Sequence, residues 1–334
     1  MSARKFLVAA LVTLGSAPAF AQVSPQCPSG GALSNDQRVQ DGCQKAIDLF
    51  AFMAPQLGTS LAGGNATLGQ ASTLGGLGHF SLGLRANVLK GALPKVDQVQ
   101  PSTTGAVKSD YPTKDQILGL PTVDAAVGLY GGFPLAITRI GGVDALISAT
   151  YLPDYKSSGG EIDVRTKGGA LKYGFGARVG ILQESVLVPG VSVTWLKRDL
   201  PTVNITGNVG TTSDTIAVNN LQLKSTAWRV VASKSFLIFG LAAGYGKDKY
   251  ESSADLYAAV SGGGPVTGRK TIAFNQNLSR NNIFADLSIN LLALKIVGEV
   301  GRVSGGSVPT YNTFGTHKAD DPYTYGPEGL RLAF

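Results

Sequence analysis

The links between the regular segments of this chain alternate in length, and this alternation restricts the possible folds more than any other feature. Short links lie near 132–141, 184–188, 234–235 and 292–293. Long polar links lie near 92–119, 153–168, 200–218, 252–280 and 304–325. A soluble β-sandwich has no reason to sort its loops by strand number. A meander barrel in a membrane does, because it has short turns on one rim and long loops on the other.

The segments between these links have the two-residue period of β-strands. In "LKYGFGARVGI", large apolar residues alternate with Lys172, Arg178 and three glycines. A strand directs alternate side chains to opposite faces, so one face is apolar and the other is polar or small. Similar alternation occurs at 79–89, 123–129, 143–151 and 283–291. The segments run roughly 9–15 residues, and roughly 9–11 tilted residues cross a bilayer.

We therefore expect an all-β fold, an antiparallel up-and-down transmembrane β-barrel of about ten strands. The link 252–280 contains "RKTIAFNQNL" and could hold another hairpin, which would make twelve strands. The apolar face would contact lipid, and the polar face would line the lumen. The lumen-facing candidates are Arg85, Asp124, Asp144, Lys172, Arg178, Arg229, Asp286, Glu299 and Arg331.

The first 21 residues have the layout of a secretory signal peptide. Arg4 and Lys5 precede a short apolar run, and "AFA" precedes Gln22, so cleavage is expected after Ala21. The run is too short for a membrane anchor, which needs roughly 20 apolar residues. Charged residues make up 15% of the chain, fewer than the roughly 25% of a soluble domain. The sequence has no basic run with interleaved aromatics, so we expect no nucleic-acid binding.

Three parts are expected: the signal peptide at 1–21, an N-terminal periplasmic or plug segment at 22–77, and the barrel at 78–334. Apolar residues at helical spacing follow Ser34, and Pro55 is expected to end this helix. Cys27 and Cys43 are the two cysteines of an exported chain, which favours a disulfide. A metal site is the rival interpretation, but two sulfurs without a nearby histidine are too few ligands.

The chain ends in "GLRLAF", where Leu330, Leu332 and Phe334 alternate with Arg331 and Ala333. With the loop pattern and the signal peptide, this end resembles Gram-negative outer-membrane β-barrel proteins. The resemblance implies that Phe334 is an assembly signal for the barrel assembly machinery and that lipid of the outer membrane surrounds the barrel. A fainter resemblance is to the long-chain fatty-acid transporter family, whose barrels carry an N-terminal hatch. The uncharged segment "LGTSLAGGNATLGQASTLGGLG" has the equivalent place, although this chain has fewer strands than is usual in that family.

The sequence favours transport over catalysis. His79 and His317 are the only histidines, and neither accompanies an identifiable serine motif. Asp320 and Asp321 lack the spaced oxygen ligands of a calcium loop, so we expect no metal, no cofactor and no enzyme activity. The leading hypothesis is a passive channel or transporter for small solutes or hydrophobic ligands. The alternatives are a non-transporting structural or surface-binding barrel, and a secreted soluble β-protein.

Overall fold

The computed structural model describes residues 22–27, 34–156, 162–209, 214–261 and 268–334. The expected signal peptide at 1–21 lies outside this part of the chain. Within the described residues, none of the helices combines the length and the apolar character that a membrane crossing requires.

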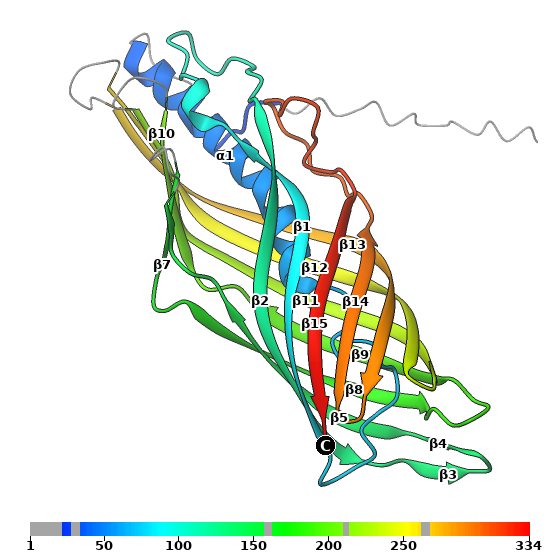
Figure 1. Cartoon of the computed structure of the whole chain (residues 1–334). Coiled ribbons are helices and arrows are strands. Elements are labelled where there is room, and N and C mark those ends of the chain that lie inside the picture. The colour runs from blue at the N-terminus through cyan, green and yellow to red at the C-terminus, as the bar shows by residue number, and fades with distance from the viewer. Residues whose placement is uncertain (1–21, 28–33, 157–161, 210–213, 262–267) are drawn as a thin grey trace, which may run out of the picture.

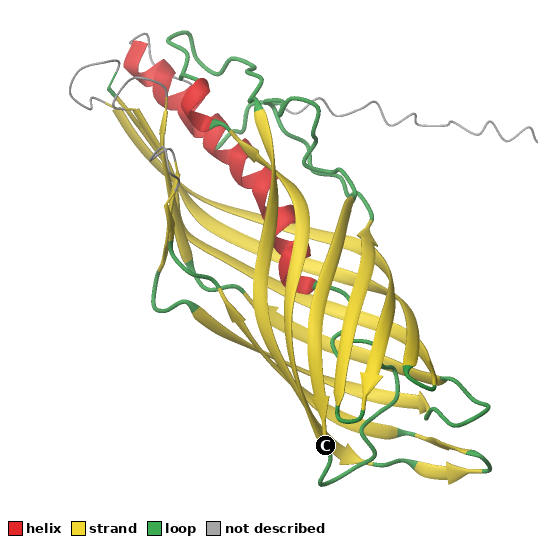
Figure 2. Cartoon of the chain, in the orientation of Figure 1, coloured by secondary structure: helices red, strands yellow, loops and turns green. Residues whose placement is uncertain are grey.

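Ten antiparallel strands of the described residues close into a ring around the helix α1 (Figures 1 and 2). In ring order they are β1 (Phe80–Pro94), β2 (Thr113–Tyr130), β5 (Gly142–Tyr151), β8 (Leu171–Leu182), β9 (Gly190–Asp199), β11 (Asp214–Phe236), β12 (Phe239–Val260), β13 (Gly268–Leu291), β14 (Leu294–Val303) and β15 (Tyr323–Ala333). β15 pairs with β1, so the ring has no free end. The expected fold class, an antiparallel β-barrel of about ten strands with an N-terminal helix, is confirmed.

We call the end of the ring where β1 begins and β15 ends the short-turn rim, and the opposite end the long-loop rim. A small hairpin of β3 (Phe133–Leu135) and β4 (Thr138–Ile140) lies in one short turn. Near the long-loop rim, β10 (Val203–Val209), β7 (Ile162–Thr166) and β6 (Tyr155–Lys156) extend the sheet sideways from β11. The 3-10 helix η1 (Val96–Gln98) follows β1.

Two expectations about the links are wrong. The link 252–280 holds no further hairpin among its described residues, because β12 runs on to Val260 and β13 begins at Gly268. Strands β6, β7 and β10 lie within links that were expected to be loops. They stand beyond the apolar part of the barrel. Apolar and polar residues do alternate in β7 and β10, but these strands have only 5 and 7 residues, fewer than the roughly 9–11 that cross a bilayer.

The turn between β11 and β12 also differs from its expected place at 234–235. The strands continue, with Phe236 opposite Phe239, and the turn consists of Leu237 and Ile238. Lys234 and Ser235 do not form this turn, because both bind residues of the neighbouring turn at 183–189. Lys234 donates hydrogen bonds to carbonyl oxygens of the turn at 183–189, and the Ser235 N–H donates to the carboxylate of Glu184.

The outward side chains form an apolar belt on the half of the ring nearer the short-turn rim. On β13 the belt covers residues 283–291, where Ile283 and Leu287 are more than half exposed. This is about the length that crosses a bilayer. Aromatic residues border the belt on both sides, as in membrane barrels. Tyr151, Tyr173, Trp195, Trp228 and Tyr245 lie toward the long loops, and Phe80, Phe133, Phe236, Phe239 and Phe334 lie near the short turns.

Helix α1 (Ser34–Ala62) runs inside the ring from the long-loop rim toward its middle (Figure 2). The expectation that Pro55 ends the helix is wrong. Proline removes one hydrogen bond within a helix, but here the wall encloses the helix and supplies partners. The Gln56 amide binds both the N–H and the carbonyl of Ala92 on β1. The helix ends at Gly63, whose φ of 60° is the left-handed conformation that glycine adopts at helix ends.

The ring closes at the short-turn rim through its two outermost residues. Phe80 and Phe334 exchange two backbone hydrogen bonds, at 3.0 and 2.9 Å. Their rings stack with centroids 5.1 Å apart. Leu330 and Leu332 face outward, and Arg331 between them is buried inside, which is the alternation of the last strand. Every edge of the membrane-level sheet is thereby paired.

Candidate functional site

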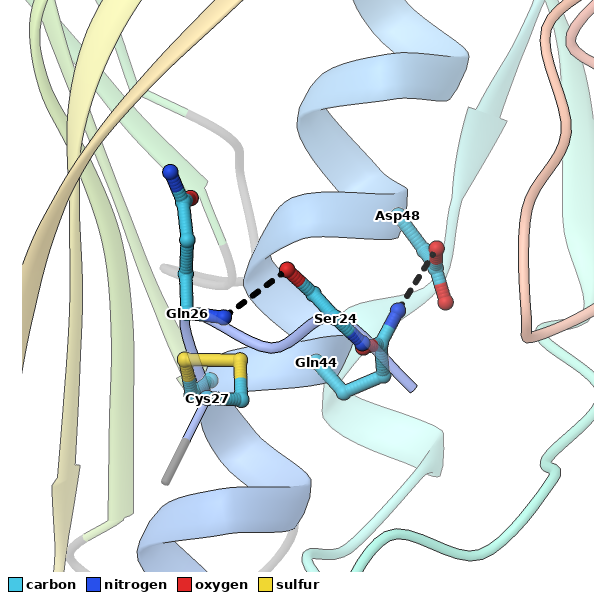
Figure 3. The surroundings of a disulfide bond; sticks show 6 residues. Ser24, Gln26, Cys27, Gln44 and Asp48 are labelled. Atoms are coloured by element: carbon cyan, nitrogen blue, oxygen red, sulfur yellow. Dashed lines mark hydrogen bonds between the residues drawn. A yellow bond between two sulfur atoms is a disulfide. The ribbon is translucent and has the colours of Figure 1, made fainter. Parts of the chain in front are cut away.

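The lumen is the candidate site, and its outer half is filled by α1. A disulfide joins Cys27 to Cys43 on this helix, with the Cα atoms 5.6 Å apart (Figure 3). Gln44 accepts a hydrogen bond from the Ser24 N–H and donates one to Asp48. The disulfide and these bonds hold residues 22–27 against the first turns of the helix.

Asp48 ties the helix to the long loop at 304–322. Its carboxylate accepts hydrogen bonds from the N–H of Tyr311, the N–H of Asn312 and the side chain of Asn312. Burial raises the pKa of the Asp48 carboxyl above its ordinary value, and the hydrogen bonds from Asn312 and Tyr311 oppose this rise. Phe52, one turn further, stacks on Phe314 of the same loop with ring centroids 4.1 Å apart.

The inner end of the helix is held by arginines of the barrel wall. Carbonyl groups in the last turn of a helix have no partner within it and carry a partial negative charge. Arg198 on β9 donates a hydrogen bond to the carbonyl of Ala62 at 2.7 Å. Arg229 on β11 donates to the carbonyl of Gly63 at 2.8 Å, and Asn282 on β13 donates to the same oxygen. The wall therefore caps the helix.

Beyond the helix, the chain crosses the inner half of the lumen without regular structure, and further cations bind its carbonyl groups. Arg85 donates to Asn65, Arg331 donates to Thr67 and Leu68, Arg178 donates to Gln70, and Lys295 donates to Gly69. Six cationic side chains from six different strands thus contact backbone oxygens of residues 62–70. We call residues 62–70 with these contacts the clasped segment.

Carboxylates of the wall neutralise four of the six cations. Asp124 forms ion pairs with both Arg85, at 2.8 Å, and Arg198, at 3.0 Å. The other two pairs are Arg178 with Asp144 and Arg229 with Asp248, each at 2.6 Å. All of these side chains are buried or nearly so. Each pair compensates for the loss of water at its charges, as buried ions require.

Two further carboxylates contact the clasped segment directly. Asp286 on β13 and Glu299 on β14 are register partners on the lumen face. The Asn65 N–H donates to Glu299 at 2.8 Å, and its side-chain amide donates to Asp286 at 2.8 Å. Gly69 N–H donates to the same Asp286 oxygen at 3.0 Å. One oxygen of each carboxylate is buried without a hydrogen-bond partner among the described residues.

The expected lumen residues meet in one network, with one exception. Arg85, Asp124, Asp144, Arg178, Arg229, Asp286, Glu299 and Arg331 are all buried in it. Lys172 is exposed, because it lies at the end of β8 toward the long loops. The sequence interpretation missed Arg198 and Asp248, which have the same two-residue spacing. Charged residues next to both of them blur the pattern in "TWLKRDL" and "GYGKDKYE".

An apolar cluster surrounds the end of the helix on one side. It consists of Leu61, Leu120, Leu200 and Leu223, with Leu57 and Leu152 packed against them. Leu120 lies on the part of β2, residues 113–121, that pairs with β1 and has no partner on its other side among the described residues. Pro121, which lacks an N–H to donate, stands where this unpaired edge begins. The outer half of the lumen is thus apolar at an interruption of the wall.

The two histidines lie at opposite ends of the barrel. His317 contacts Asp115 at 3.1 Å on the exposed long loops, and His79 precedes β1 at the short-turn rim. Across the part of the chain that the structure describes, no three or more His, Cys, Asp or Glu side chains gather as a metal site would require.

No protein-family model and no curated protein matches the chain. Among solved structures, it is similar to a "TodX deltaS2S3 mutant monoaromatic hydrocarbon channel", with a TM-score of 0.35 and 12% identity over 83% of this chain and 74% of that one. It is also similar to the Ralstonia pickettii toluene transporter TbuX, with a TM-score of 0.25 and 11% identity over 82% and 96% of the two chains. A third similar structure is the outer membrane channel DcaP of Acinetobacter baumannii, with a TM-score of 0.19 and 11% identity over 80% of this chain and 100% of that one. At these scores the similarity carries no argument about function.

Proposed function

We propose that this chain is an outer-membrane channel or transporter for small solutes or hydrophobic ligands, closed by its own N-terminal segment. The clasped segment is the observation that carries this proposal. Six wall cations bind backbone carbonyls of residues 62–70, which belong to no strand of the wall. A barrel whose lumen is merely filled can pair its wall charges with one another. Here the wall cations also bind a segment of the chain that forms no part of the ring.

The exterior supports a membrane location. Exposed leucine, isoleucine and valine side chains and two aromatic borders surround the ring, as lipid requires and as water would disfavour. This surface argues against a secreted soluble β-protein. With the expected signal peptide, it supports the outer membrane of a diderm bacterium as the location. The barrel assembly machinery is the partner that we propose reads Phe334.

The lumen supports two kinds of solute. Its outer half is apolar around α1 and reaches the unpaired edge of β2, where a hydrophobic ligand would meet apolar side chains. Its inner half is polar, and there small hydrophilic solutes would replace the hydrogen bonds of the clasped segment. Both routes require residues 62–70 to leave.

Planar-bilayer conductance of a variant that weakens the clasp tests the proposal. Asn65→Asp places a third carboxylate beside Asp286 and Glu299 and removes the hydrogen bond that the Asn65 side-chain amide donates to Asp286. We expect its open probability to exceed that of the wild type by about tenfold, the effect of about 1.4 kcal/mol. Asn277→Asp is the matched control, because it makes the same charge change at an exposed position of β13, and its conductance should equal that of the wild type.

The presence of α1 and the clasped segment inside the ring favours one alternative, a non-transporting structural or surface-binding barrel. The same recordings separate the two functions. If the wild type, Asn65→Asp and a chain lacking residues 22–77 all fold into bilayers and none conducts or takes up solute, the barrel does not transport.

A further inference from the structure

The cavity at the short-turn rim has an excess of unpaired positive charge. It has a volume of about 640 Å³ and lies between the turns at 183–189 and 237–238. Gln70 of the clasped segment and Lys295 of β14 border it on the lumen side. It therefore lies next to the clasped segment, at the short-turn end of the lumen.

Two cations lie side by side near the inner end of this cavity, and of these Lys295 lines it. Lys295 and Arg331 are register partners on β14 and β15. Like charges directly opposite each other in a sheet repel and destabilise it. Neither has a carboxylate within 4 Å among the described ion pairs, unlike the four other arginines of the clasp. Their present partners are neutral carbonyl oxygens at Thr67, Leu68 and Gly69.

The hydrogen-bonding groups around the cavity lack a free negative acceptor. The one carboxylate that lines it, Glu184, already accepts hydrogen bonds from the Ser235 N–H and the Ser233 hydroxyl. Arg331 is 5% exposed, and no acceptor among the described residues reaches its Nε. The Gln70 side chain, which accepts a bond from Arg331, is the group between that guanidinium and the cavity.

The lining also has an apolar part. Val186 and Leu237, at the tips of the two turns, border the same cavity as Lys295. A ligand that satisfied both parts would carry one anionic group and a compact apolar body. Its anion would contact the ammonium of Lys295, and, with Gln70 displaced, the free Nε of Arg331.

We propose that this cavity binds small organic monocarboxylates, with Lys295 as the residue that contacts the carboxylate. This assigns a substrate class to the proposed channel, and in that respect it rests on the proposed function. The ligand is recognised at the short-turn end of the lumen, beneath the clasped segment, so binding requires no opening of the barrel.

Isothermal titration of the full chain in detergent with benzoate tests the proposal, and benzamide, its neutral isostere, is the control ligand. We expect benzoate to bind and benzamide to bind at least about tenfold more weakly. Lys295→Gln should weaken benzoate binding at least about tenfold, the size expected for a charge-assisted hydrogen bond. Lys295→Arg, which keeps the charge, should restore most of it. Lys247→Gln, an exposed lysine on β12, should bind like the wild type.

Equal binding of benzoate and benzamide, absence of benzoate binding, or unchanged binding by a folded Lys295→Gln variant would each overturn the proposal. Heat-modifiable migration in electrophoresis shows that each variant is folded. The titration is independent of conductance. Benzoate binding by a barrel that never conducts would reject the proposed channel function and support the carboxylate site. Conductance without benzoate binding would support the channel function and reject the site.

Discussion

The backbone N–H of Asn65 donates a hydrogen bond at 2.8 Å to the carboxylate of Glu299, which follows it by 234 residues. This contact joins the chain just after the helix to the inner wall of the barrel. Because the wall residue is buried, breaking this hydrogen bond would leave its oxygen without a partner, at a cost of about 1–3 kcal/mol. The clasp can therefore be tested by changing the residues that position Asn65.

Gly64→Ala is expected to loosen the clasped segment. A Cβ at this position would overlap the carboxylate of Glu299, so either the segment or the Glu299 side chain must shift. The variant should increase deuterium exchange at the amides of residues 62–70 by about tenfold. Gly298→Ala on β14 is the control, because a Cβ there meets nothing within 4 Å. Equal exchange in the two variants would show that Glu299 does not restrain the segment.

Arg229→Ala should destabilise the barrel strongly. It removes the hydrogen bond to Gly63 and leaves Asp248 buried without its cation, a change that typically costs about 3–5 kcal/mol. Urea unfolding from liposomes measures the loss. The double variant with Asp248→Ala should recover part of it, because the unpaired charge is gone. Arg165→Ala, which breaks an exposed pair with Asp163, should change stability by less than about 1 kcal/mol.

Deletion of Phe334 should impair assembly. The residue supplies two backbone hydrogen bonds and an aromatic contact to Phe80, and these close the ring. The fraction of heat-modifiable, folded barrel in outer-membrane preparations is the measurement. Phe239→Ala removes an exposed aromatic from the same rim but leaves the closing pair intact, and it should assemble nearly normally. Equal assembly of the two variants would contradict a special role for the last residue.

Acidification should loosen the contact between the loops at 95–112 and 304–322. Asp110 accepts hydrogen bonds from the Thr313 hydroxyl and the Gly315 N–H, and these lower the pKa of its carboxyl below the ordinary 3.8. A lowered pKa in the folded state means that the contact stabilises fully above pH 3.8 and is lost as pH falls below that value.

Hydrogen exchange at the Gly315 amide, compared at pH 5 and pH 3 after correction for the intrinsic rate, measures this loss. Protection should fall on acidification in the wild type. The variant Asp110→Asn should show less protection at pH 5 and no change between the two values. A wild-type protection factor that stays constant would show that the carboxylate does not hold the loops together.

The barrel could be predicted because lipid imposes a rule on every strand that faces it. Leu171 to Ile181 must alternate with small or polar residues wherever one side meets acyl chains and the other meets the lumen, so Arg85 and Arg178 were identifiable from spacing alone. Beyond the apolar belt, outward side chains meet water and need not be apolar. Lys197 and Lys247 can point outward into water there, and this concealed their neighbours Arg198 and Asp248.

The length of α1 could not be predicted for a related reason. Local chemistry at Pro55 favours an end to the helix, and only the surrounding wall supplies partners such as Ala92, which is 36 residues from Gln56 in sequence. The partners of Arg229 and Arg331 were equally hidden. Backbone carbonyls have no residue-specific signature, so a side chain that binds them leaves no pattern in the sequence.

The direction of the N-terminal segment has a consequence for the order of assembly. Residue 34 lies at the long-loop rim and Phe80 at the short-turn rim, so residues 34–79 pass through the ring from one mouth to the other (Figure 1). A ring that had already closed would have to admit a helix with a disulfide-bonded loop past its buried arginines. Strands β1 and β15 must therefore pair around a chain that is already in place. The N-terminal segment then guides the closure of the barrel before it blocks the lumen.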